Sequence, residues 1–276
     1  WTLEALGTMV RAVGEDANQD GIYDENDVYG LMTWLDNVQA ILAGAGERVC
    51  RVNDSGELEL TLYNERVVNL YDDFTALIYD SSHVFNYQYD NKTGDRSSSD
   101  VWDKNRVNMF NNNQAMFYFT MLTTVPRHRD STTDFGILPY PKYDENQENY
   151  GHGIGVNQCT FICVPEMVKN DARTGFVLEE LSYQGKKLLT PAYYEQTLIG
   201  QYTRDEESAE MLDLIFATRV YDVGLYYNIG KYKDALANMF VNRRTLTTVY
   251  ETYRESAEQT VAEINAAFSS QDGAEK

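Results

Sequence analysis

The spacing of apolar and polar side chains predicts a chain that alternates helices with short strands. Residues 2–14 repeat apolar side chains every three or four positions after Thr2, a favourable N-cap residue, so this segment is predicted to be a helix. Residues 30–34 form a short apolar run that is typical of a buried strand. The turn Asp54-Ser55-Gly56 lies between two alternating runs and therefore predicts a β-hairpin.

Two residues with short polar side chains are placed to begin helices. Asp36 precedes a small helix that ends at Gly44-Ala45-Gly46, where glycine can close a helix. Asn64 precedes a longer helix with one apolar face. The apolar positions of that face are Val67, Leu70, Tyr71, Phe74, Leu77 and Ile78.

The second half of the chain continues the alternation and becomes mainly helical after Pro165. The polar stretch 90–100 is predicted to be an exposed loop, and Phe135–Pro141 begins as a strand that must leave its sheet at the prolines. A Gly-rich link at 151–155 leads to an apolar strand expected over 160–164. Further segments predict a helix at 102–110, a strand at 115–120, and amphipathic helices near 168–184, 205–222, 231–241 and 245–268. This alternation indicates the α/β class.

Composition and charge narrow the possible partners. The 276 residues carry 43 acidic and 23 basic side chains, and the formal net charge of -20 would repel nucleic acid and an anionic membrane surface. No apolar run reaches the roughly 18 residues that a membrane span needs. The chain opens at Trp1 without the pattern of a signal peptide, so we expect that any export signal has been removed or lies upstream. The three cysteines follow no zinc or disulfide pattern and are predicted to be buried free thiols.

Residues 16–27 match the pattern of a calcium-binding loop. Side-chain oxygens fall at loop positions 1, 3, 5, 9 and 12, Gly21 stands at position 6 for the sharp turn, and position 7 offers a backbone carbonyl. The predicted ligands are Asp16, Asn18, Asp20, Ile22, Asp24 and Asp27. Because position 12 is Asp27 and not Glu, we expect a static Ca²⁺ site; the alternative is a solvated acidic turn.

Aromatic side chains at predicted strand ends and chain crossings are candidates for sugar binding, because aromatic faces pack against the C–H groups of pyranose rings. The candidate ligand-binding residues are Trp34, Tyr118, Tyr150, His152, Tyr226 and Tyr227. For any one of them ordinary core packing is the alternative. No catalytic motif points to an enzyme, although the paired carboxylates of a glycosidase remain possible among so many acidic residues.

The order of these features resembles that of a known family. The opening Trp-Thr-x-Glu-x-Leu helix, the strand ending in Trp34, the Gly44/Gly46 turn and the hairpin at Gly56 occur in the same order as in the family 1 extracellular solute-binding proteins. Met109 to Met116 is similar to their Phe-x-x-Gly-x-x-Ala-Met segment, with Asn112 in place of the Gly, which Asn can replace in a left-handed turn. That carbohydrate-binding family includes maltose-binding protein.

The resemblance implies a two-lobed, periplasmic-binding-protein-like (type II) α/β fold with most of the first lobe missing from this chain. Residues 1–150 would belong to the second lobe, 151–203 would return to the first lobe, and 204–276 would complete the second. The implied function is the capture of a small-molecule carbohydrate between two lobes for an ABC importer in the membrane. The implied protein is a monomer and not an enzyme, extracellular and lipid-anchored through an upstream segment. The alternatives are a secreted glycan-active enzyme and a calcium-stabilised scaffold module.

Overall fold

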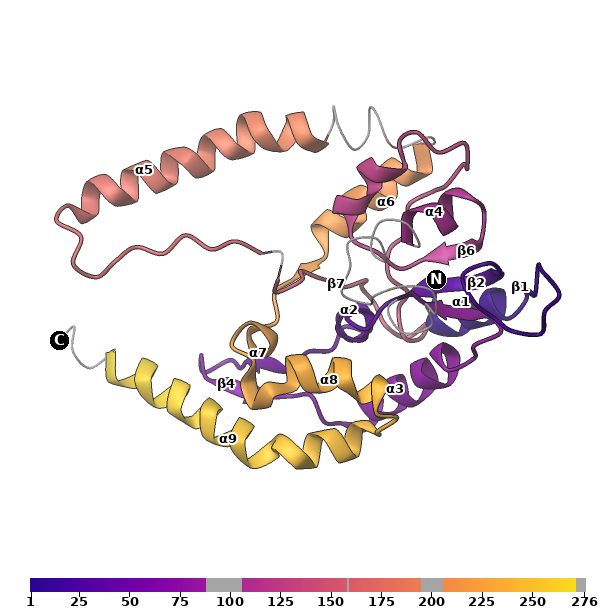
Figure 1. The fold of residues 1–276 in the computed structure, drawn as a ribbon. Coiled ribbons are helices and arrows are strands. Elements are labelled where there is room, and N and C mark those ends of the chain that lie inside the picture. The colour runs from indigo at the N-terminus through magenta and orange to yellow at the C-terminus, as the bar shows by residue number, and fades with distance from the viewer. Residues whose placement is uncertain (88–105, 158, 195–205, 272–276) are drawn as a thin grey trace.

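A computed structural model of the chain describes residues 1–87, 106–157, 159–194 and 206–271. The predicted loop at 90–100 and the first part of the predicted helix 102–110 lie outside these ranges. The described residues form a mixed α/β body from which a helical arm projects (Figure 1). No helix in the described ranges has both the length and the apolar character needed to cross a membrane.

A small sheet organises the first half of the body. Its central strand β2 (Val28–Thr33) runs parallel to β5 (Val84–Asn86) on one side and to β6 (Ala115–Tyr118) on the other, and antiparallel to the short β1 (Gly14–Glu15). Leu31 pairs with Val84 in β5 and with Phe117 in β6. Because these three strands are parallel, their carboxyl ends meet at one edge of the sheet, where ligands of α/β proteins usually bind.

The helices around this sheet begin largely as the sequence predicts. The Thr2 side chain caps α1 (Leu3–Val10), which ends earlier than residue 14 because the chain there turns into β1. Asn64 caps α3 (Glu65–Ile78) by accepting from the Val67 amide. The predicted hairpin is confirmed as β3 (Cys50–Val52) and β4 (Leu58–Leu60), joined at Gly56 with its φ of +81°. Asp36 precedes α2 (Asn37–Gly44) but makes no capping hydrogen bond, so that detail of the prediction is wrong.

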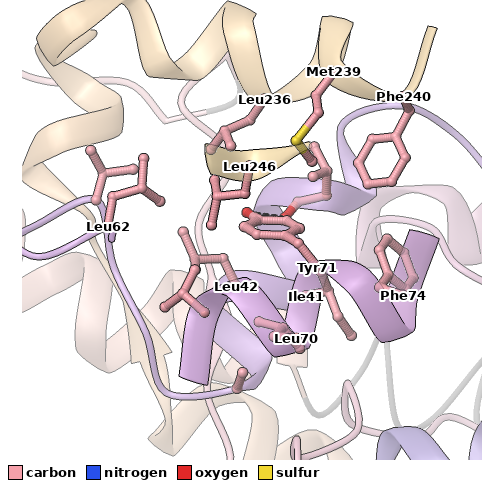
Figure 2. Packing of buried hydrophobic residues seen from close by; sticks show 14 of the residues in the cluster. Ile41, Leu42, Leu62, Leu70, Tyr71, Phe74, Leu236, Met239, Phe240 and Leu246 are labelled. Atoms are coloured by element: carbon pink, nitrogen blue, oxygen red, sulfur yellow. Dashed lines mark hydrogen bonds between the residues drawn. The ribbon is translucent and has the colours of Figure 1, made fainter. Parts of the chain in front are cut away.

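The main hydrophobic core joins these helices to the C-terminal part of the chain. Leu70, Tyr71 and Phe74 of α3 pack against α2 and against residues of α8 (Tyr232–Val241) and α9 (Leu246–Gln271) (Figure 2). Tyr71 satisfies its buried hydroxyl by donating to the Val38 carbonyl. The C-terminal helices therefore fold onto the N-terminal sheet and helices as one core. Its labelled members are Ile41, Leu42, Leu62, Leu70, Tyr71, Phe74, Leu236, Met239, Phe240 and Leu246.

The remaining elements link the sheet to the C-terminal helices. After β5 come α4 (Arg106–Asn111), β6 and the 3₁₀ helix η2 (Leu122–His128). Further along are α6 (Glu206–Ala217), the short helix α7 (Val223–Tyr226) and the 3₁₀ turn η5 (Ile229–Lys231). β7 (His152–Gly153) pairs in parallel with β8 (Arg219–Val220), so two segments far apart in sequence run side by side at this point.

The arm extends between β7 and α6 and carries α5 (Asp171–Gln184), which continues into the π-helical turn η3 (Gly185–Leu189). In Figure 1, α5 stands well away from the body. None of residues 159–194 is buried, and Phe176, Leu181 and Leu189 are among the apolar side chains left exposed. The arm touches the body at its two ends, where Phe161 packs on Tyr226 and Tyr194 bonds to Asp213.

Three expectations for this half of the chain are wrong. Residues 135–141 and 160–164 form no strand, because neither run finds a strand to pair with among the described residues. The left-handed residue of the Asn turn is Asn113, with φ of +60°, and not Asn112. Of the three cysteines only Cys50 is buried, whereas Cys163 is exposed on the arm.

Candidate ligand-binding cleft

A cavity of about 270 Å³ opens at the carboxyl edge of the parallel strands, and we call it the cleft. Three groups of residues form its walls: the segment from the end of β2 into α2, residues 120–123 after β6, and the paired crossing segments around β7 and β8. The end of α6 adds Ile215 and Phe216. The cleft therefore lies both at the ligand-binding edge of the sheet and where the chain passes between the body and the arm.

The beginning of α2 places polar groups in the cleft. Asn37, the first residue of α2, holds the turn before the helix: its amide oxygen accepts from the Thr33 hydroxyl and the Trp34 backbone N–H, and its amide nitrogen donates to the Tyr140 hydroxyl. The Asp36 side chain makes no capping hydrogen bond, and Asp36 lines the cleft. Burial raises the pKa of Asp36, and nearby Lys233 opposes this shift. The carboxylate is thus a partly desolvated acceptor beside a helix N-terminus.

Trp34 lies directly after β2 and is partly exposed in the cleft. Its ring stacks on the buried Tyr87 with centroids 6.3 Å apart and an interplanar angle of 16°. This support holds one face of the indole in a fixed orientation. Apolar side chains of Met121, Leu122 and Phe216 line the same cavity, so the walls combine an aromatic face with aliphatic surface.

His152 lines the cleft from β7, but both of its ring nitrogens already have partners. Nε2 accepts from the Tyr140 backbone N–H at 3.2 Å, and Nδ1 lies 2.7 Å from the Thr218 hydroxyl. Since Nε2 must remain an acceptor, the ring has to be neutral. Burial lowers the pKa of His152 to about 4, in agreement with this requirement. His152 therefore positions the crossing segment and is poorly placed to bond a ligand.

Asp222 fixes the other crossing segment to the hairpin. It is buried after β8, and its carboxylate accepts from the backbone amides of Val49, Cys50 and Gly224. Burial raises the pKa of Asp222, and these amide hydrogen bonds lower it. Although Asp222 borders the cleft, its oxygens are committed to the backbone.

The structure separates the other predicted ligand-binding residues from the cleft. Tyr118 lines a neighbouring cavity, and Tyr150 packs under the Lys142 ammonium group, 5.4 Å from its ring centroid. Tyr226 packs on Phe161 and donates to the Ile154 carbonyl at 3.4 Å, near the base of the arm. Tyr227 is 67% exposed and lies outside the cleft lining. The cleft thus brings together Trp34 and His152 of the predicted set.

Several cleft residues could not be recognised from the sequence alone. The sequence predicts Asp36 only as a helix cap and not as a residue of the cleft. Thr120, Thr123 and Arg219 are of residue types that are common at any protein surface. Arg219 donates to the Phe216 carbonyl, and its guanidinium lies 5.3 Å from the Phe216 ring centroid. Asp36 follows β2, and Thr120 and Thr123 follow β6, so the ends of these two strands were the available signal, since ligands gather at such strand ends. Arg219 lies in β8, inside a segment that is predicted to be helical.

The acidic loop at 16–27 is held by its own side chains. Both Asp16 oxygens accept from the backbone amides of Asp20 and Gly21, and both Asp27 oxygens accept from those of Ala17 and Asp24. Asp27 is fully buried, with no cationic side chain paired to it in the described ranges. As the side chains stand, no three acidic, His or Cys groups of the described residues converge on a common metal position.

Comparisons with solved structures show which folds this chain resembles. The chain is similar to the ABC substrate-binding protein Lmo0181 from Listeria monocytogenes, solved in complex with cycloalternan, with a TM-score of 0.57 at 12% identity. It is also similar to M. tuberculosis UspC, with a TM-score of 0.54 at 15% identity. Each match covers 95% of this chain and 64% of the solved chain. No protein-family model and no curated protein sequence matches it.

The expected fold class is therefore confirmed: the chain has a mixed α/β fold that corresponds to part of a two-lobed substrate-binding protein. It spans slightly under two-thirds of the length of the two solved structures. At these identities the likeness establishes the fold, and the function has to be argued from the cleft.

Proposed function

We propose that this protein is a solute-binding component of an ABC importer and that it captures a carbohydrate in the cleft. The observation that carries the proposal is the composition of the cleft at the carboxyl edge of the sheet: a supported Trp34 face beside the unpaired carboxylate of Asp36 and the hydroxyls of Thr120 and Thr123. Sugars present an apolar C–H face and a ring of hydroxyls, so these walls suit them.

The comparisons support the ligand class. The Listeria protein of the same fold was solved in complex with cycloalternan, a carbohydrate. The net charge of -20 also favours a neutral ligand over an anionic one. We infer a binding protein and not an enzyme. Two residues with carboxylates, Asp36 and Asp222, line the cleft, but the Asp222 carboxylate accepts from backbone amides and is therefore poorly suited to proton transfer.

The division into lobes is part of the proposal. We assign residues 1–150 and 204–276 to one lobe and 151–203 to the returning part of the other. The exposed apolar side chains of the arm support this assignment, because in a soluble protein such a surface calls for a covering structure. On this basis the solute is held between the lobes, which close by a hinge at the crossing segments near His152 and Val220.

The remaining properties follow from this role. The protein acts as a monomer outside the cytoplasmic membrane, attached to it by a lipid anchor upstream of Trp1. It delivers its carbohydrate to the membrane subunits of the importer.

Calorimetric titration with a panel of oligosaccharides tests the proposal. We expect weak binding to this chain, because one lobe supplies only part of the contacts, and a further loss of at least about 10-fold for Trp34→Ala. Tyr227→Ala is the matched control, since this aromatic side chain is exposed outside the cleft, and it should bind as the wild type does. Equal losses in both variants, or none in either, would count against the cleft as the binding site.

We further propose that loop 16–27 holds one Ca²⁺ ion through Asp16, Asn18, Asp20, Ile22, Asp24 and Asp27. The donor chemistry suits a hard cation, and the fully buried, unpaired carboxylate of Asp27 is costly without a nearby positive charge. Each Asp16 and Asp27 oxygen that accepts one N–H retains a second lone pair for an ion. The ion would anchor the end of α1 to the start of β2.

Thermal unfolding in calcium and in chelator tests the loop. Because an ion that binds only the folded form stabilises it by mass action, calcium at about 100 times its dissociation constant should add about 2.7 kcal/mol. Asp20→Ala, which removes one exposed ligand, should abolish the difference. A wild-type melting temperature that is the same in both buffers would leave the acidic turn as the correct interpretation.

A further inference from the structure

A second cavity of about 460 Å³ lies beside the edge of β6, and we call it the side cavity. Several aromatic residues line it, among them Phe110, Tyr118 and Phe135. Thr120, Met121, Leu122 and Tyr140 line both this cavity and the cleft. The two cavities therefore adjoin along the segment that follows β6. Both volumes are close to or within the roughly 300–1,000 Å³ of small-molecule sites.

His128 contributes an unused hydrogen-bond acceptor to the side cavity. The residue is only 2% exposed, and its Nδ1 lies 2.8 Å from the side-chain oxygen of Asn111. An amide oxygen can only accept, so Nδ1 carries the hydrogen and Nε2 is the acceptor. Nε2 is buried and has no hydrogen-bond partner among the residues that the structure describes. Burial, with Arg106 and Arg127 nearby, lowers the pKa of His128 to about 4, so the ring is neutral near pH 7.

Tyr118 contributes a buried hydroxyl oxygen that can still accept a hydrogen bond. The neighbouring Thr120 hydroxyl donates to Thr124 at 3.0 Å, so toward Tyr118 it can act only as an acceptor and leaves the lone pairs of the Tyr118 oxygen available. The Tyr118 and His128 rings meet edge to face with centroids 5.8 Å apart, and Phe110 packs against both. Burial raises the pKa of Tyr118 to about 12, so the hydroxyl keeps its proton.

These two groups define the ligand chemistry that the side cavity would accept. A buried polar atom without a partner costs free energy, and a ligand that supplies the partner regains it. One ligand hydroxyl could donate to His128 Nε2, and another could bond to the Tyr118 hydroxyl. The aromatic walls offer faces for C–H groups, and a neutral ring with several hydroxyls meets all of these requirements.

We propose that the side cavity is a second saccharide subsite, continuous with the cleft, so that the preferred ligand is an oligosaccharide long enough to occupy both. This inference rests on the proposed function, since it extends the same site. Tyr118 and His128 would then contribute to the binding of long saccharides and not to that of short ones, which the cleft alone accommodates.

Titrations with a homologous series of saccharides test the subsite. Affinity should rise with chain length once the saccharide outgrows the cleft. Tyr118→Phe, which removes one hydroxyl, should weaken binding of the long saccharides about 3- to 10-fold and leave the short ones unchanged. His128→Asn keeps a donor toward Asn111 and removes the Nε2 acceptor, so it should act in the same way. Tyr150→Phe is the control, because this hydroxyl lies in neither cavity.

The outcomes separate this inference from the proposed function. Short saccharides that bind, with no gain in affinity for long ones and no effect of Tyr118→Phe, would overturn the subsite alone. A crystal structure with a long saccharide in which the side cavity holds only water would overturn the subsite as well. No binding of any saccharide would overturn the proposed function, and the subsite with it. Should His128→Asn fail to fold, Tyr118→Phe decides the question.

Discussion

His152 shows how one buried side chain makes the crossing segments sensitive to pH. Its folded-state pKa of about 4 lies below the ordinary value of 6.5, so the folded protein binds fewer protons than the unfolded chain between these values. The contribution of His152 to the free energy of unfolding is therefore fully present above about pH 6.5 and is lost progressively as the pH falls toward 4. By pH 5 the loss should reach about 2 kcal/mol.

Denaturant unfolding at pH 7.5 and pH 5 checks this prediction with His152→Gln, which cannot titrate in this range. Between pH 7.5 and pH 5 the free energy of unfolding should fall by about 2 kcal/mol less in the variant than in the wild type, whatever the variant's stability at pH 7.5. His128 shifts in the same direction, but its contribution is present in both proteins and cancels. The same pH dependence in both proteins would show that His152 is not the group responsible.

For single residues, the sequence predicts which side chains line the cleft better than it predicts what each side chain does there. Trp34 was expected in the cleft and lines it, because a large aromatic at the end of a buried strand has few other places to lie. His152 was also expected there, yet its nitrogens are used by Tyr140 and Thr218, which are 12 and 66 positions away in the chain. Such distant partners leave no local pattern from which the role could be predicted.

Helix starts allow a direct comparison between two predicted caps. Asn64 caps α3 by accepting a hydrogen bond from the Val67 amide, whereas the Asp36 side chain before α2 makes no capping hydrogen bond. We expect Asn64→Ala to lower the free energy of unfolding by about 1 kcal/mol. Asp36→Ala should change it by less than about 0.5 kcal/mol while weakening saccharide binding. Similar stability losses in the two variants, measured by denaturant unfolding, would contradict this assignment of the caps.

Helices were predicted more accurately than strands for a physical reason. A helix such as α3 satisfies its backbone hydrogen bonds within one segment, so its cap and apolar face can be identified locally. A strand needs a partner, and the apolar runs at 135–141 and 160–164 find none in the described part of the chain. The strands predicted at 30–34 and 115–120 did form, as β2 and β6, but their parallel pairing with each other and with β5, which places the cleft, joins segments more than 50 residues apart.

At the scale of the whole molecule, the order of elements carried more information than any single motif. The α/β class and the partial two-lobed fold follow from that order and agree with the solved substrate-binding proteins. None of the described arm residues 159–194 is buried, and their apolar side chains fit the proposal that a second lobe covers them. The cleft lies at the base of this arm, so the proposed binding site and the proposed hinge depend on the same crossing segments.

The central claim, that a carbohydrate binds in the cleft, is tested most directly by a nuclear magnetic resonance titration that follows the indole N–H of Trp34. The signal is assigned by its loss in Trp34→Phe, whereas Trp1, which lines the side cavity and not the cleft, should shift only with saccharides long enough to reach that cavity. We expect oligosaccharides to shift the Trp34 signal with a dissociation constant of about 1 mM or weaker, which corresponds to a binding free energy of roughly -4 kcal/mol, because one lobe makes only part of the contacts. A Trp34 signal that stays in place while Trp1 shifts, or that no oligosaccharide moves at tens of millimolar, would contradict it.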